Sequence, residues 1–310
     1  MTQVQRNYHG DSLFAAESAQ VEPGRIYPPW LVSMLRMEAP PMVYAKATHL
    51  AADQAASIFA APKNKSIYLI GTNDRAWYHI AGLPLFQNIL TSQAYYMSGS
   101  MITTRQPTWT YTAGWFDYIA AHPWAAIGRY SNTPNSVASV DFPGGLLLIG
   151  YSMADGNGGL ITVKIDGNVV GTINTVPSSL IQGGAGHSQY APGVFRLTNQ
   201  PAGVLTLTPT GSGFVMIDWI GGLPSTQLHL LTLPKTRNGD DAEVAAYNAA
   251  INVVAAQCAT DGFPVSMIDT GSVVRLNEMA EGPSAFTLTN SYHPNNHGAI
   301  NIAVKIAASV

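Results

Sequence analysis

The sequence has little cysteine and little charge. Cys258 is the single cysteine of the 310 residues, so the chain forms no internal disulfide, and its apolar-periodic surroundings predict a buried structural thiol. Charged residues make up 11% of the chain, and 15 basic against 18 acidic side chains leave a net charge of −3. This balance argues against nucleic acid and an anionic membrane as partners.

Long apolar runs are also missing. None approaches the length of a membrane span, so we expect no membrane insertion. Residues 1–9 lack the apolar stretch of a secretory signal. Three origins therefore stay open: a mature form, a domain cut from a longer chain, or a protein exported by another route, which leaves a secreted or virion-associated protein possible. The low cysteine content does not separate these origins, because it is compatible with either redox compartment.

Glycine, threonine, serine and asparagine are abundant where charge is scarce, with 29 glycines in the chain. This composition is typical of a β-rich protein whose surface is polar through hydroxyl and amide groups. Such a surface suits neutral sugars, and it is also common in ordinary β domains.

The two ends of the chain alternate expected strands and helices, which is typical of an α/β core. We expect strands at 4–8, 41–47, 66–70, 228–233 and 265–268, and helices at 27–37, 50–59, 240–258 and 296–308. The strand at 66–70 is nearly all apolar and ends at Gly71, which indicates a buried parallel strand. Open α/β sheets bind ligands at the carboxyl ends of such strands.

The middle of the chain, 106–213, has a different pattern. Short alternating runs are separated by turn signals, of which Asp166-Gly167-Asn168 is a strong hairpin turn. The spacing predicts an antiparallel β-sandwich or jelly roll inserted into the core. We therefore expect 1–105 and 214–310 to form the two halves of the α/β core.

Three short motifs carry the chemistry. They are Gly10-Asp11-Ser12-Leu13, Gly71-Thr72-Asn73-Asp74 and His293-Pro294-Asn295. Together they supply a serine on a tight turn, an amide that can donate to an oxyanion, and a late histidine as general base.

The order of these motifs resembles the SGNH (GDSL) hydrolase family. The resemblance implies a flavodoxin-like core with a parallel sheet, Ser12 as nucleophile and His293 as base. It implies an oxyanion hole formed by Ser12, Thr48 and Asn73. The inserted sandwich resembles the β modules of carbohydrate esterases and of phage tail-type members.

Two positions depart from the family pattern. The second block lacks its glycine and reads Lys46-Ala47-Thr48-His49, so the backbone N–H of Thr48 or His49 takes that role. The acid of the last block is Asn290, whose side-chain oxygen can orient His293 without charge. The alternatives are an acid from elsewhere, with Asp269 best placed, or a Ser-His dyad.

Several other residues have two interpretations. We assign Asp74, Trp77 and Tyr292 to substrate binding, although Trp77 is equally suited to packing. Asp11 is expected to stabilise its turn as a hydrogen-bond acceptor. His293 and His297 have no third ligand, so we expect no metal and no cofactor. The aromatic cluster is either a sugar-stacking platform or sandwich core; its members are Trp109, Tyr111, Trp115, Phe116, Tyr118 and Trp124.

The sequence thus predicts a serine esterase that removes short acyl groups, most simply acetyl, from a carbohydrate or polysaccharide. One alternative is a glycan-binding or structural, phage tail-like protein with a weakened hydrolase site. Another is a lipase or thioesterase. The sequence leaves the oligomeric state open.

Overall fold

The computed structural model describes the chain in two compact units. The described residues are 4–11, 14, 28–46, 48–118, 127–154, 158–176, 190–211, 213–235, 241–274, 294 and 296–310. One unit, here called the α/β unit, comprises Met1–Gln54, Pro62–Leu90 and Thr226–Val310. The other, the β unit, comprises Ala55–Ala61 and Thr91–Ser225. In its described ranges the chain is thus a mixed α/β protein with one parallel and two antiparallel sheets.

The α/β unit is built on a parallel sheet. Its strands follow the order β16-β15-β3-β1-β2, and each neighbouring pair runs parallel. The strands are β1 (Asn7–Gly10), β2 (Met42–Val43), β3 (Ser66–Leu69), β15 (Leu228–Leu231) and β16 (Val265–Ile268). The residues of β1, β3 and β15 are buried throughout, as expected for a parallel sheet covered on both faces.

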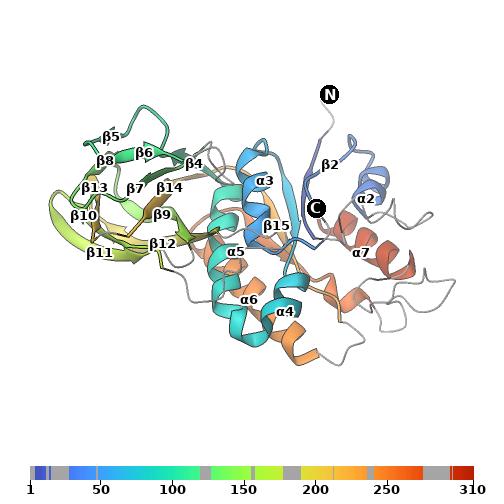
Figure 1. Ribbon diagram of the computed structural model, residues 1–310. Coiled ribbons are helices and arrows are strands. Elements are labelled where there is room, and N and C mark those ends of the chain that lie inside the picture. Colours follow the sequence, from blue (N-terminus) through green and yellow to red (C-terminus); the bar gives the residue numbers. More distant parts are fainter. Residues whose placement is uncertain are drawn as a thin grey trace. The chain divides into compact units, whose positions relative to one another are not determined.

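Helices flank this sheet. The pair α2 (Pro28–Arg36) and α7 (Asn296–Ser309) lies together on one side, and α4 (Thr72–Tyr78) and α6 (Asp241–Thr260) lie on the other (Figure 1). Three short 3₁₀ turns, η1 (Ala52–Gln54), η2 (His79–Gly82) and η3 (Gly271–Val273), complete the unit. Cys258 is buried on α6, which confirms the expected structural thiol.

The strand order reverses at β1. The chain leaves β1 to form β2 on one side of it and then returns to form β3 on its other side. In open α/β sheets the connections diverge at such a point and leave a crevice outside the carboxyl ends of the strands. Two of the three motifs follow these strands, after Gly10 and after Leu69.

The β unit contains two antiparallel sheets in its described part. One has the order β11-β10-β13-β8-β5, and the other has β12-β9-β14-β7-β6 with β4 also paired to β14. The strands are β4 (Gly99–Thr103), β5 (Thr110–Tyr111), β6 (Trp115–Asp117), β7 (Arg129–Ser131), β8 (Ala138–Phe142), β9 (Gly145–Ala154), β10 (Leu160–Ile165), β11 (Asn168–Asn174), β12 (Tyr190–Gln200), β13 (Gly203–Thr210) and β14 (Val215–Pro224). Helix α3 (Ala55–Ala60) belongs to this unit, and α5 (Leu83–Ser98) continues from the α/β unit into it.

The short alternating runs expected in this segment form strands, among them β9 to β13. The hairpin between β10 and β11 is also confirmed. Its central residues Asp166 and Gly167 have φ of 46° and 80°, which is the pair of positive angles that a type I′ turn requires.

The limits of the β unit differ from the expected 106–213. Residues 214–220, expected in the second half of the core, belong largely to β14, which pairs with β4, β7 and β9. A buried apolar strand has the same sequence pattern in either kind of sheet, so its partners cannot be read from it.

Smaller differences lie in the α/β unit. The strand expected at 4–8 is Asn7–Gly10, the strand at 41–47 is shortened to Met42–Val43, and the helix at 50–59 divides into η1 and α3. No helix in the described ranges is long and apolar enough to cross a membrane.

Candidate active site

The turn after β1 lies against β3. Gly10 has a φ of +145°, and a Cβ at this position would lie 2.0 Å from the carbonyl oxygen of Leu69. Only glycine permits this approach without a shift of the backbone. The next residue, Asp11, is fully buried and donates its backbone N–H to the same Leu69 oxygen at 3.3 Å. Ser12 follows Asp11 in the chain and lies outside the described residues.

The loop after β3 places Asn73 beside the segment that precedes η1. Gly71, with a φ of +119°, ends the β3 connection and begins α4. Asn73 Nδ2 donates to the backbone oxygen of His49 at 3.0 Å. A side-chain amide carries two N–H donors, and this bond uses one of them.

The segment with Thr48 is hydrogen-bonded to the end of β1 and to the start of α4, which follows β3. The Lys46 N–H donates to the Gly10 oxygen at 3.1 Å, and the His49 oxygen accepts the Asn73 amide. Thr48 itself has a φ of +64°, in the left-handed region that favours glycine. Thr48 also lies in the segment where the family pattern has the glycine that this chain lacks.

Gln54 links Gly10 of β1 to His49, a role that was not predicted from the sequence. It is fully buried, its Oε1 accepts the Gly10 N–H at 3.4 Å, and its Nε2 lies 2.8 Å from His49 Nδ1. A glutamine in an Ala-rich segment gives no sequence signal of this role. Its partners become evident only when β1 and η1 are placed together.

Asp74 lies in the interior of the α/β unit. Both carboxylate oxygens accept the backbone N–H of Ala51, at 3.1 and 3.0 Å. Burial raises the pKa of Asp74 to about 8, with a further upward contribution from the charges of Asp53 and Asp11 and an opposing one from the Ala51 N–H. The side chain is 2% exposed, so it holds the 48–51 segment in place instead of presenting an oxygen for the expected substrate contact.

Trp77 differs from Asp74 in its exposure. Its side chain is 50% exposed on α4, which leaves it accessible to a ligand. The end of α4 is held from α6: Glu243 Oε1 lies 3.1 Å from His79 Nδ1, and the Tyr247 hydroxyl donates to the His79 oxygen at 3.0 Å.

Asp269 follows β16 at the carboxyl edge of the sheet. Its Oδ1 accepts the Thr232 hydroxyl at 2.8 Å and the Ser272 N–H at 3.2 Å. Burial raises the pKa of this carboxyl, but the hydrogen bonds from Ser272 and Thr232 outweigh it and hold the pKa below its ordinary value. Asp269 is therefore ionised at neutral pH and already has two donors.

The last motif lies mostly outside the described residues. His293, Asn290 and Tyr292, which the sequence assigns to the site, lie outside the described residues. The helix expected after His293 is confirmed as α7, which begins at Asn296. In the part of the chain that the structure describes, no three histidine, cysteine or acidic side chains form a group that could hold a metal ion.

The aromatic cluster of the β unit is divided between core and surface. Trp109, Trp115 and Tyr118 are 5%, 7% and 5% exposed, which supports the core interpretation for them. Phe116 is 51% exposed, and Trp124 lies outside the described residues. The Tyr111 ring lies 6.0 Å from the rings of both Trp109 and Trp115.

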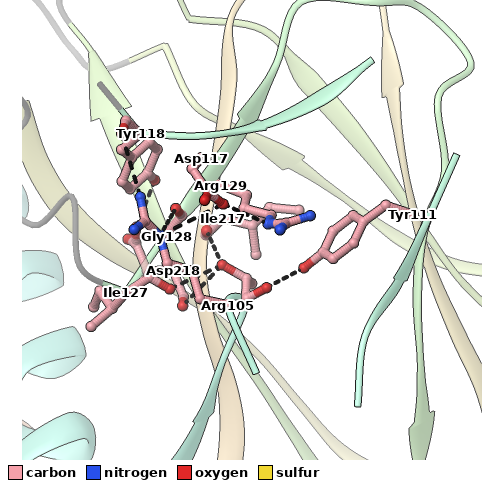
Figure 2. A network of polar contacts seen from close by, with 10 residues as sticks. Arg105, Tyr111, Asp117, Tyr118, Ile127, Gly128, Arg129, Ile217 and Asp218 are labelled. Carbon is pink, nitrogen blue, oxygen red and sulfur yellow. Dashed lines mark hydrogen bonds and ion pairs between the residues drawn. The ribbon is translucent and has the colours of Figure 1, made fainter. Parts of the chain in front are cut away.

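Two residues of the cluster, Tyr111 and Tyr118, belong to a network of polar contacts (Figure 2). The Arg129 guanidinium lies 4.2 Å from the centre of the Tyr111 ring and 2.9 Å from Asp117 Oδ1, and the Tyr111 hydroxyl donates to the Thr104 oxygen. On a second branch the Tyr118 hydroxyl donates to Asp218 Oδ1 at 2.6 Å. The charges of Arg129 and Asp117 are therefore paired with each other.

No family model matches the sequence, and no curated protein matches it. Similar solved structures include the catalytic domain of a GH87 α-1,3-glucanase in complex with tetrasaccharides (12% identity, 46% of this chain and 30% of that chain, TM-score 0.32). They also include a CBM35 module from Paenibacillus barcinonensis (15%, 41% and 100%, TM-score 0.31). A third is a two-domain esterase active on acetylated mannans, co-crystallized with mannopentaose (7%, 72% and 91%, TM-score 0.38).

The chain spans less than a third of the length of the glucanase domain. At these identities and TM-scores the three likenesses carry no conclusion about function.

Proposed function

We propose that the protein is a serine ester hydrolase that removes short acyl groups from a carbohydrate. The observation that supports this most strongly is the meeting of three sequence segments at the reversal of strand order. The turn after Gly10, the segment around Thr48 and the loop with Asn73 are joined by the hydrogen bonds Lys46 N–H to Gly10 and Asn73 to His49. These are the segments from which the SGNH resemblance draws its nucleophile and oxyanion hole.

In the proposed reaction, Ser12 attacks the ester carbonyl while His293 takes the hydroxyl proton. The carbonyl oxygen becomes an oxyanion, and the sugar oxygen then leaves as an alcohol with the proton from His293. Water attacks the acyl-enzyme with His293 again as base, which releases the carboxylic acid and restores Ser12.

The oxyanion is stabilised by three donors in this proposal. They are the Ser12 N–H, the Thr48 N–H and the second N–H of the Asn73 amide. The bond to His49 restricts rotation of that amide, so its other hydrogen has a defined direction before substrate binds. Such preorganisation is what makes an oxyanion donor effective.

Two side chains are candidates for orienting His293, and they differ in charge. Asn290 presents an oxygen without charge. Asp269 presents a carboxylate, but its two hydrogen bonds to Thr232 and Ser272 favour a structural role for it. We therefore propose Asn290 as the orienting residue.

A serine-directed fluorophosphonate tests the nucleophile directly. The protein should be labelled at one site, and mass spectrometry of peptides should find the label on Ser12. Ser12→Ala should abolish labelling, whereas the matched control Ser309→Ala, which removes an exposed serine at the end of α7, should not. Labelling that persists in Ser12→Ala would contradict the proposal.

The preferred length of the acyl chain distinguishes a short-chain esterase from the lipase alternative. Turnover of p-nitrophenyl acetate should exceed that of the butyrate and the octanoate, and acetylated polysaccharide should release acetate. Faster turnover of the octanoate would favour a lipase or thioesterase. A protein that binds glycan but reacts with neither fluorophosphonate nor ester would be the glycan-binding alternative.

A further inference from the structure

Three aromatic side chains project from one face of the sheet that contains β6, β7 and β14. Phe116 and Tyr130 are directly opposite in the pair β6·β7, and Tyr130 is opposite Met216 in the pair β7·β14. Opposite residues share a face, and residues two apart along a strand share it as well. Phe214, two residues before Met216, therefore projects from the same face as Phe116 and Tyr130.

Part of this face is exposed. Phe116 and Phe214 are 51% and 40% exposed, whereas Met216 and Tyr118 on the same face are 4% and 5% exposed. The alternate residues Trp115, Ser131 and Val215 are also opposite one another, and they are 7%, 0% and 0% exposed. Exposed positions of a sandwich sheet are ordinarily polar, but here two of them hold aromatic rings.

The three rings form one continuous surface. The centroids of Phe116 and Tyr130 are 5.7 Å apart at an interplanar angle of 36°, and those of Tyr130 and Phe214 are 5.9 Å apart at 40°. We call this set the aromatic platform. Contiguous exposed aromatic surface on a folded domain indicates a binding site.

Two neighbouring side chains hold the platform in place. The Tyr118 ring lies parallel to Tyr130, at 6.5 Å and 8°, and its hydroxyl donates to buried Asp218, which also accepts the Ser152 hydroxyl at 3.0 Å (Figure 2 shows Tyr118 and Asp218). The Thr175 hydroxyl donates to the Phe214 oxygen at 3.1 Å. Rings that are fixed before binding lose less conformational entropy when a ligand arrives.

The chemistry of the platform favours a neutral ligand. The nearest charged residues on these strands, Asp117 and Arg129, project from the opposite face and pair with each other. The three rings of the platform carry no charge, and Tyr130, whose ring contacts both Phe116 and Phe214, adds a phenolic hydroxyl. This combination fits a pyranose ring, whose C–H face packs on an aromatic ring while its rim offers hydroxyl groups.

We propose that the aromatic platform binds the pyranose rings of a neutral polysaccharide. This inference rests on the proposed function for its ligand, a carbohydrate, and adds the place on the β unit where that carbohydrate binds. The platform differs from the one expected from the sequence, because Trp109 and Trp115 are interior, whereas Tyr130 and Phe214 were not among the residues expected.

Affinity gel electrophoresis of the full chain tests this inference. Glucomannan, xylan and dextran are cast separately into native gels, and the retardation of the protein gives an association constant. We expect retardation by at least one of them. Phe116→Ala and Phe214→Ala should each weaken it about tenfold. The control Val169→Ala removes an exposed apolar side chain of β11 and should leave it unchanged.

A second pair of variants separates stacking from general apolar contact. Phe116→Leu keeps an apolar side chain without a ring and should bind as weakly as Phe116→Ala, whereas Tyr130→Phe keeps the ring and should retain most of the binding. No retardation of the wild-type protein by any of the three polysaccharides would overturn the inference. Equal retardation of wild-type, Phe116→Ala and Phe214→Ala protein would overturn it too.

The outcome is distinguishable from that of the proposed function. Hydrolysis of p-nitrophenyl acetate should be unchanged in the platform variants, and Ser12→Ala should bind polysaccharide as the wild type does. Binding without any hydrolysis would reject the esterase and retain the platform. Hydrolysis of the ester together with unaltered polysaccharide binding in the platform variants would retain the esterase and reject the platform.

Discussion

Asn73 Nδ2 donates to the backbone oxygen of His49 across 3.0 Å. The bond joins the first turn of α4 to the segment that contains Thr48, a residue with a left-handed backbone. One amide thus fixes the spacing between two proposed oxyanion donors. Asp74, the next residue in the chain, reinforces the arrangement by accepting the Ala51 N–H.

Asn73→Ala should therefore lower kcat for p-nitrophenyl acetate by about 10² to 10³, the usual loss when one oxyanion donor is removed. The Michaelis constant should change little, because the donor acts mainly in the transition state. Asn168→Ala, in the hairpin of the β unit, is the matched control and should keep full activity. Full activity of Asn73→Ala would remove Asn73 from the oxyanion hole.

Asn290→Asp should preserve or raise turnover. A carboxylate near His293 would raise the pKa of the imidazole, so the acidic limb of the profile of kcat/KM against pH should move to higher pH. Rates measured from pH 5 to 9 show the shift. Asp269→Asn should leave turnover nearly unchanged; a loss near 10⁴ would instead identify Asp269 as the acid of the triad.

Asp74→Asn should make stability less dependent on pH. The pKa of Asp74 is raised from 3.8 to about 8 in the folded protein, so the native state retains a proton that the unfolded chain releases between these values. The wild type should lose stability as pH rises from about 4 to 8, and the variant should lose less. The difference in melting temperature between Asp74→Asn and the wild type should therefore grow in favour of the variant as pH rises. Each kcal/mol of difference in the free energy of unfolding corresponds to about 2–4 °C.

Asp269→Asn provides the opposite control for that experiment. The pKa of Asp269 is lowered by folding, so its contribution is present above the ordinary carboxyl pKa and is lost as pH falls through that range. The variant should be less stable than wild type at neutral pH, and the gap should close in acid. Parallel pH profiles of the two variants would contradict both assignments.

Gly10→Ala should destabilise the α/β unit. The new methyl group would overlap the Leu69 oxygen, and φ at this position is +145°. Gly262→Ala is the matched control, since Gly262 also has a positive φ of +85° but has no atom within 4 Å of the added Cβ. Comparing the melting temperatures of the two variants separates the effect of the overlap from that of the positive φ. If the melting temperature of Gly10→Ala falls no further than that of Gly262→Ala, β1 and β3 can move apart to accept the methyl group.

Much of the fold was predictable from local pattern. The strand at 66–70, the helix after His293 and the turn at Asp166-Gly167 each have strong periodicity or turn chemistry. The strand β14 was misplaced because its apolar pattern is compatible with either kind of sheet. Pairing depends on partners far along the chain, which single-segment patterns do not reveal.

The proposed chemistry of the candidate site comes from the sequence, whereas the contacts of its residues come from the structure. The sequence located Asn73 and the Thr48 segment, which the structure joins through His49. It assigned Asp74, the last residue of the Gly71–Asp74 motif, to substrate binding, but the side chain is buried at the start of α4. Gln54 was not predicted, because its role depends on the close approach of β1 and η1.

The strand order also bears on how the chain is made. During synthesis from the N-terminus, β1, β2 and β3 emerge first and can pair, but the other edge of β3 has no partner until Leu228–Leu231 has been translated. All of the β unit lies before that point. At about 5–20 residues per second the buried strand Ser66–Leu69 waits several seconds or more with one open edge. A nascent chain halted near residue 225 would therefore expose an aggregation-prone edge and be a substrate for ribosome-associated chaperones.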